Sequence, residues 1–250
     1  MPVSDVSSML FTVVLAVVGS IAGGVAALAG FGIGSLLTPT LATATGTKLA
    51  VAAVAIPHFI GTAQRFWTLR AHVDRRVLFG FGLASAVGGL AGALIHTRVT
   101  GDALALVFGL LLLIAGVSEL TGWMRRVRWG RGAAWVAGAL SGVFGGLVGN
   151  QGGIRAAAML GFHVPQQSFV ATATAIALIV DLARLPVYVA TQWRDLLSVW
   201  PLVLIATVGV VIGTAIGVRV LGRLPAPWFR RVLAMLLLAL GVYMLAVGAR

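Results

Sequence analysis

Two stretches of the chain, GGVAALAGFGIGSLLTPTL at residues 23–41 and GVFGGLVGNQGGIRAAAML at residues 142–160, share a glycine-rich pattern. In both, an apolar run is interrupted by glycines, which permit positive φ and a close approach of backbones. At an offset of 119 residues, Gly23, Leu28, Gly30, Gly34 and Leu41 match Gly142, Leu147, Gly149, Gly153 and Leu160. The pattern predicts a fold that is built from two related halves.

The correspondence extends along nearly the whole chain. Arg65 matches Arg184 at the same offset of 119 residues. Later in each half the offset is 125 residues, and there Gly92, Arg98, Gly116, Val117 and Leu120 match Gly217, Arg223, Gly241, Val242 and Leu245. A longer loop near 191–198 accounts for the six additional residues (125 − 119). We therefore predict two repeats, 1–125 and 126–250.

The composition indicates the solvent in which these repeats fold. Of the 250 residues, 60% are hydrophobic and 10% are charged, whereas a soluble domain is about 45–50% apolar and about 25% charged. This excludes a soluble globular protein, a disordered chain and a nucleic-acid-binding domain. The chain has no cysteine and none of the common motifs of metalloproteases, P-loop NTPases or serine hydrolases. We expect no enzyme activity, no cofactor and no metal site.

Ten apolar segments follow one another along the chain, and we expect them to be helices because only helices span lipid as single segments. Two of them, 33–44 and 154–163, are shorter than the roughly 20 residues that a bilayer requires. The longer segments are 9–29, 49–69, 77–97, 103–123, 132–149, 168–190, 199–221 and 229–248. The prediction is an all-α integral membrane protein in which each repeat has a glycine-rich intramembrane helical hairpin and three transmembrane helices.

The loops carry most of the net charge of +12, as the positive-inside rule describes for membrane proteins. Loop 70–76 has three arginines and its counterpart 191–198 has one, whereas loop 98–102 has one and its counterpart 219–231 has four. Equivalent loops therefore exchange charge, which predicts that the repeats are inverted in the membrane. If each glycine-rich stretch forms a hairpin, eleven basic loop residues lie on one side of the membrane and four on the other. If each stretch is one broken span, the division is nine against six, so the hairpin gives the stronger bias.

The turn of each hairpin is a candidate anion site. A helix that begins at such a turn directs unpaired N–H groups and a positive dipole end into the membrane, and transporters bind substrates in this way. The alternative is close helix packing through small residues. The candidate ligands are Gly30, Gly32, Gly34, Gly149, Asn150, Gln151, Gly152 and Gly153. The two amide side chains either bind the anion or cap the hairpin.

Three arginines lie inside apolar segments, where a charge is costly and by default indicates function. Arg155, in the first turn of the second short segment, opposes the helix dipole unless an anion binds there. Arg65 and Arg184 occupy equivalent positions of the repeats, and they either add positive potential to the site or snorkel to the membrane surface.

Two further groups are candidates for proton coupling. Asp181 is the only acidic residue well inside a span, and it precedes Arg184 by one helical turn. It either pairs with that arginine or carries a proton during transport. His58 follows Pro57 in mid-span, so it either packs against the carbonyl that the proline frees or relays a proton.

The chain resembles the sulfite exporter TauE/SafE family, also called the toluenesulfonate uptake permease family. The resemblance lies in the glycine patterns GVAALAGFGIG at 24–34 and GVFGGLVGNQGG at 142–153, and it covers almost the whole chain. It implies transport of sulfite, sulfonates or related organosulfur anions across the bacterial cytoplasmic membrane. Ile33 interrupts the triple glycine of the first pattern, and Asn150 and Gln151 replace small residues in the second.

These observations together predict a secondary transporter that moves a small anion by alternating access. Its partners are the anionic substrate and the lipid bilayer, with no nucleic acid, and a homodimer is one option for its assembly. An anion channel and a membrane subunit that only docks a partner are the alternatives. Uniport, proton coupling through Asp181 or His58, and exchange all stay open as coupling modes.

Overall fold

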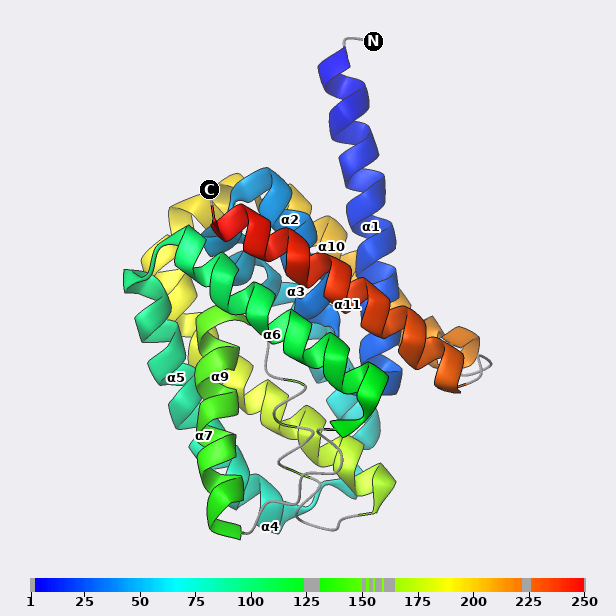
Figure 1. Cartoon of the computed structure of the whole chain (residues 1–250), viewed down its shortest axis with the longest axis vertical. Coiled ribbons are helices and arrows are strands. Elements are labelled where there is room, and N and C mark those ends of the chain that lie inside the picture. Colours follow the sequence, from blue (N-terminus) through cyan, green and yellow to red (C-terminus); the bar gives the residue numbers. More distant parts are fainter. Residues whose placement is uncertain are drawn as a thin grey trace.

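The computed structural model describes residues 3–123, 131–149, 152, 155, 159, 165–221 and 226–249. All regular structure in these residues is helical, which confirms the predicted all-α architecture (Figure 1). Seven of the described helical segments are long and apolar enough to cross a membrane: Met9–Ala29, Thr47–His72, Arg75–Arg98, Gly101–Thr121, Gln167–Ser198, Trp200–Gly217 and Pro227–Gly248. The chain is a multi-pass membrane protein.

The first glycine-rich stretch forms a turn between two helices. Helix α1 (Val3–Ala29) ends there, and α2 (Ile33–Thr45) begins after Gly30 and Gly32, whose φ angles are 79° and 132°. Side chains with a Cβ rarely adopt such angles, so the glycines are required by the turn itself. With 13 residues, α2 extends about 20 Å, which is less than the ~30 Å of a hydrocarbon core. Most of α2 is buried in protein.

The first half continues through helices of transmembrane length and a short polar segment. These elements are α3 (Thr47–Leu69), η1 (Arg70–His72), α4 (Arg75–Val77), η2 (Leu78–Gly82), α5 (Leu83–Arg98) and α6 (Gly101–Thr121). The carboxylate of Asp74 accepts the backbone N–H groups of Arg76 and Val77 and so caps α4. Gly122, in the left-handed region at φ 67°, ends α6.

The second half begins with the second glycine-rich turn. Its helices are α7 (Arg131–Val148), α9 (Gln166–Ser198), α10 (Trp200–Leu221) and α11 (Ala226–Gly248). Gly149, after α7, has a φ of 74°, close to that of its counterpart Gly30. The predicted short segment 154–163 lies outside the described residues except for Arg155 and Met159, which are helical and buried.

Helix α9 corrects one prediction. The loop expected at 191–198 is helical to Ser198, with a bend at Gln192, where φ is −132° and ψ is 22°. Polar side chains made this segment look like a loop. Helical hydrogen bonds need only backbone groups, so the chain bends at one residue and continues as a helix.

The helices of the two halves pack in reciprocal pairs. Helix α1 lies against α10 and α7 lies against α5, while α3 packs on α9 and α6 on α11. A Cβ added at Gly23 would lie 2.8 Å from the nitrogen of Thr214, and one added at Gly142 would lie 2.9 Å from the nitrogen of Gly89. Gly142 is the repeat mate of Gly23, and Thr214 stands 125 residues after Gly89. The same close contact through small residues therefore occurs twice, with the two halves exchanged.

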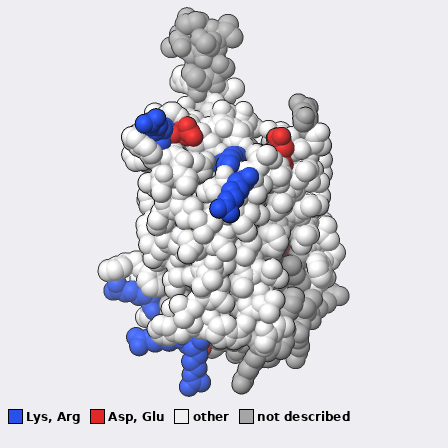
Figure 2. All heavy atoms as spheres, turned by 90° about the vertical axis from the view of Figure 1, so that its left-hand side faces the viewer, with Lys and Arg blue, Asp and Glu red and all other residues white. Residues whose placement is uncertain are grey.

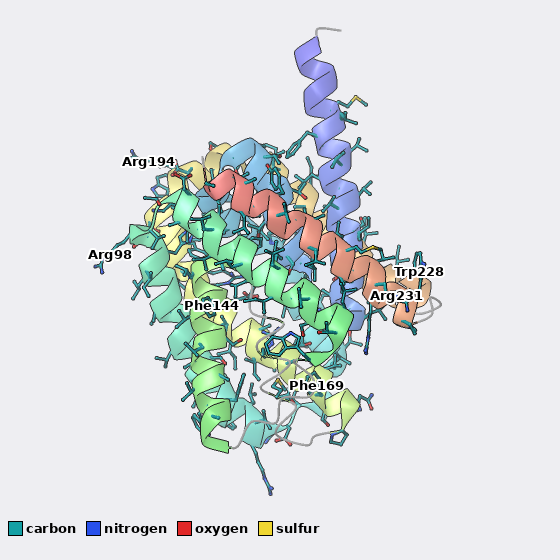
Figure 3. All side chains as sticks on the ribbon, in the orientation of Figure 1. Arg98, Phe144, Phe169, Arg194, Trp228 and Arg231 are labelled. Carbon is teal, nitrogen blue, oxygen red and sulfur yellow. The ribbon has the colours of Figure 1, made fainter. Side chains whose placement is uncertain are left out.

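On the face shown in Figure 2, the exposed charged side chains gather towards two ends of the molecule. Figure 2 shows a broad band without charged side chains between these ends on the face in view. Arg98 and Arg194 lie near one end (Figure 3), whereas α4, with Arg75 and Arg76, lies at the opposite end (Figure 1). The equivalent segments 70–76 and 191–198 are thus at opposite ends of the structure.

Candidate anion-binding site

The two glycine-rich turns lie against each other, although about half the chain separates them. A Cβ added at Gly34 would come 2.5 Å from the carbonyl oxygen of Gly149, and one added at Gly152 would overlap the side chain of Phe31. Such a close approach of backbones requires glycine. Of the candidate glycines, the structure brings together Gly34, Gly149 and Gly152, with Gly30 and Gly32 in the same first turn. Asn150, Gln151 and Gly153 lie outside the described residues.

Arg65 and Arg184 bond the two turns in the same manner. Arg65 donates from Nη1 to the carbonyl oxygen of Ala26, and Arg184 donates from Nη1 to that of Gly145 at 2.8 Å. The two acceptors are 119 residues apart, as are the two arginines (145 − 26 and 184 − 65). Each of these carbonyls also accepts the N–H of the first turn glycine, at 2.9 and 3.0 Å. Each arginine thus stabilises the negative end of the helix that precedes its turn.

These two arginines are buried in the protein. Arg65 is 6% exposed and Arg184 is 1% exposed. Their guanidinium groups therefore bond groups inside the protein rather than reach its surface. In this position they bond the two turns.

The second turn has two further side-chain donors that the sequence did not reveal. Tyr188 donates from its hydroxyl group to the carbonyl oxygen of Gly146, and Nδ1 of His96 donates to that of Leu147 at 2.8 Å. Together with Arg184, they bond three consecutive carbonyls at the end of α7, where intrahelical donors run out. The position equivalent to Tyr188 in the other half is Leu69, and the position equivalent to His96 is Leu221. These two extra contacts therefore hold only the second turn.

Tyr188→Phe should lower the stability of the protein. The change leaves the buried carbonyl of Gly146 without this donor, which costs about 1–3 kcal/mol. The midpoint of thermal unfolding in detergent measures the effect. Tyr243→Phe is the matched control because Tyr243 is the other tyrosine of the chain and is 39% exposed. Equal midpoints for the two variants would contradict the bond.

Asp181 connects Arg184 to His58 inside the protein. Its Oδ1 accepts from Nε of Arg184 at 2.9 Å and lies 2.8 Å from Nη2. Its Oδ2 lies 2.6 Å from Nδ1 of His58, which comes from α3. The expected ion pair between Asp181 and Arg184, which both lie on α9, is therefore present. His58 faces this carboxylate rather than the carbonyl that Pro57 frees.

Arg65 differs from its repeat mate in having neutral partners. Besides Ala26, it donates from Nε to Oγ1 of Thr174 at 3.1 Å. The position that corresponds to Asp181 in the first half is Thr62 (181 − 119 = 62). The hydroxyl group of Thr62 is buried and has no hydrogen-bond partner among the described residues.

Arg155 completes the cluster of buried charges. It is 3% exposed, and its Nη1 has no hydrogen-bond partner in the described part of the chain. It interacts electrostatically with Arg65, Asp181 and Arg184. Burial of a guanidinium group without a counter-ion is costly. The cluster thus combines an excess of buried positive charge with a donor that has no partner in the described part of the chain.

Comparison with known proteins gives one family. The model of the sulfite exporter TauE/SafE family matches residues 15–244, nearly the whole chain. Neither a curated protein nor a solved structure matches the chain. The matched range includes both glycine-rich turns and all the buried charged residues of the cluster.

Proposed function

The chain belongs to the sulfite exporter TauE/SafE family, and we propose that it is a secondary transporter for sulfite, a sulfonate or another small organosulfur anion in the bacterial cytoplasmic membrane. The observation that carries the proposal is the buried charge. Arg65, Arg155 and Arg184 are all buried, and among the described side chains Asp181 carries the only carboxylate that interacts with them, so with His58 neutral the cluster has a net charge of +2 (3 − 1). An anion that binds there balances a charge that is otherwise expensive to bury.

We place the anion at the junction of the two turns. Arg155 is its principal ligand in this proposal, because its Nη1 is a charged donor that has no hydrogen-bond partner among the described residues. Backbone N–H groups of the glycine-rich turns, with the side chains of Asn150 and Gln151, add further donors. Arg65 and Arg184 hold the turns and contribute positive potential.

We propose that the repeats 1–125 and 126–250 are inverted and that one rocks against the other during transport. Three observations support this arrangement. The arginine–carbonyl bonds occur once in each half at equivalent positions. The glycine contacts between α1 and α10 recur between α7 and α5. The equivalent segments 70–76 and 191–198 lie at opposite ends of the structure (Figures 1 and 3).

Cysteine labelling tests the inverted topology, since the chain has no cysteine of its own. We expect Arg76→Cys and Arg194→Cys to react with a membrane-impermeant maleimide from opposite sides of the membrane. Both positions are exposed at the surface. Arg98→Cys is the control and should label from the same side as Arg194→Cys. Labelling of residues 76 and 194 from one side would refute the inversion.

Transport itself is tested with purified protein in proteoliposomes. We expect saturable uptake and counterflow for at least one member of a panel of sulfite, sulfonates, thiosulfate and carboxylates. Unitary currents without counterflow would identify a channel. No flux of any anion would refute the proposal and leave the role of a docking subunit.

A further inference from the structure

The two halves differ in the residue that stands one helical turn before the paired arginines. On α9, Asp181 precedes Arg184 by three residues and neutralises it. On α3, Thr62 precedes Arg65 by the same three residues and offers only a hydroxyl group. Residues three apart on a helix share a face, so a carboxylate at position 62 would meet Arg65 as Asp181 meets Arg184. The charge of Arg65 therefore persists because the first half has threonine where the second has aspartate.

The sequence accounts for every carboxylate side chain that could alter this balance. The chain has six acidic residues, and the structure describes the side chains of all of them except Asp5. Those other than Asp181 lie near helix ends or beside loops: Asp5, Asp74, Asp102, Glu119 and Asp195. In the described part of the chain, Asp181 is the only acid with which the three buried arginines interact.

We propose that the site selects dianions over monoanions and that Thr62 is the residue that sets this preference. The inference rests on the proposed function and specifies its substrate class. A doubly charged sulfur oxyanion cancels the net charge of the cluster. A singly charged anion, such as an alkanesulfonate, leaves one buried positive charge without a partner, and that charge weakens binding.

A comparison of sulfate with methanesulfonate tests the effect of ligand charge at nearly constant ligand shape. Both are tetrahedral and of similar size, but sulfate carries two charges and methanesulfonate one throughout the neutral pH range. Binding to purified wild-type protein is measured as the rise in unfolding temperature with anion concentration. We expect an apparent affinity for sulfate at least about tenfold higher than that for methanesulfonate.

Thr62→Asp tests the assigned residue. The new carboxylate lowers the net charge of the cluster from +2 to +1, so the ratio of the two affinities should shift toward methanesulfonate by about tenfold or more. Thr62→Asn is the matched control, because asparagine has the shape of aspartate without its charge. It should keep the wild-type ratio.

Three outcomes overturn the inference: equal affinities of the wild type for the two anions, binding of neither, or the same ratio in Thr62→Asp and Thr62→Asn. If Thr62→Asp does not fold, the affinities of the wild type for sulfate and methanesulfonate still test the preference for dianions. The proposed function fails in a different way, through absence of flux in proteoliposomes. A protein that transports methanesulfonate as well as sulfate retains the function and refutes the charge selection.

Discussion

Arg155→Met should abolish anion counterflow in proteoliposomes without lowering the stability of the anion-free protein. Loss of one partner of a buried charged contact costs about 2–5 kcal/mol, which corresponds to a decrease in affinity of about 30-fold to several thousandfold. Burial of the Arg155 guanidinium group is costly because its Nη1 has no hydrogen-bond partner among the described residues, so an apolar side chain at this position should not destabilise the anion-free protein. The repeat mate of Arg155 is Leu36, a buried apolar residue (155 − 119 = 36), so methionine suits the position.

Counterflow and the unfolding temperature together distinguish a ligand of the anion from a structural arginine. A structural arginine would lower the unfolding temperature when replaced, whereas a ligand of the anion should not. Arg155→Lys keeps the charge and should retain part of the activity, although it loses the planar donor pair. Arg231→Met, at an exposed position (Figure 3), is the control for general effects and should transport like the wild type. Normal counterflow in Arg155→Met would remove Arg155 from the site.

Asp181→Asn should destabilise the protein by about 3–5 kcal/mol, the cost of breaking a buried ion pair at one partner. The carboxylate is buried, accepts from Arg184 and faces His58, so its loss leaves the guanidinium group without a counter-charge. Thermal or denaturant unfolding in detergent measures the difference.

The same helix offers a control for this substitution. Asp195→Asn changes an exposed carboxylate near the end of α9 and should alter stability by no more than about 0.5 kcal/mol. The double variant Asp181→Asn/Arg184→Met removes both charges and should recover part of the loss, because no unpaired charge remains from the pair. If Asp181→Asn were as stable as the wild type, the ion pair would not stabilise the core.

The sequence predicted the helices well because long apolar segments have few alternatives in a membrane. The predicted segments 33–44 and 49–69 agree with α2 (Ile33–Thr45) and α3 (Thr47–Leu69) within two residues. The prediction was wrong at 191–198, where polar side chains stand in a helix that bends at Gln192. Hydropathy reports where side chains meet lipid, whereas the continuity of a helix depends on backbone geometry.

The candidate site was predictable in its charges but not in its contacts. Arginine inside an apolar segment is conspicuous, which is why Arg65, Arg155 and Arg184 stood out. Their partners depend on tertiary packing, because any backbone carbonyl is an acceptor until the fold selects one. His96 gave no signal for this reason, since its acceptor lies 51 residues away. Only a weak indication in the sequence pointed to Tyr188, which follows Arg184 by four residues and so lies on the same face of the helix.

We propose that the anion binds where the two glycine-rich turns meet. A crystal structure with selenate, located by the anomalous signal of selenium, tests it directly, because selenate is a dianion with the shape of sulfate. We expect a selenium peak between the turns, with a selenate oxygen about 2.7–3.2 Å from a guanidinium nitrogen of Arg155. Selenium bound only at exposed loop arginines, with no peak between the turns, would contradict it.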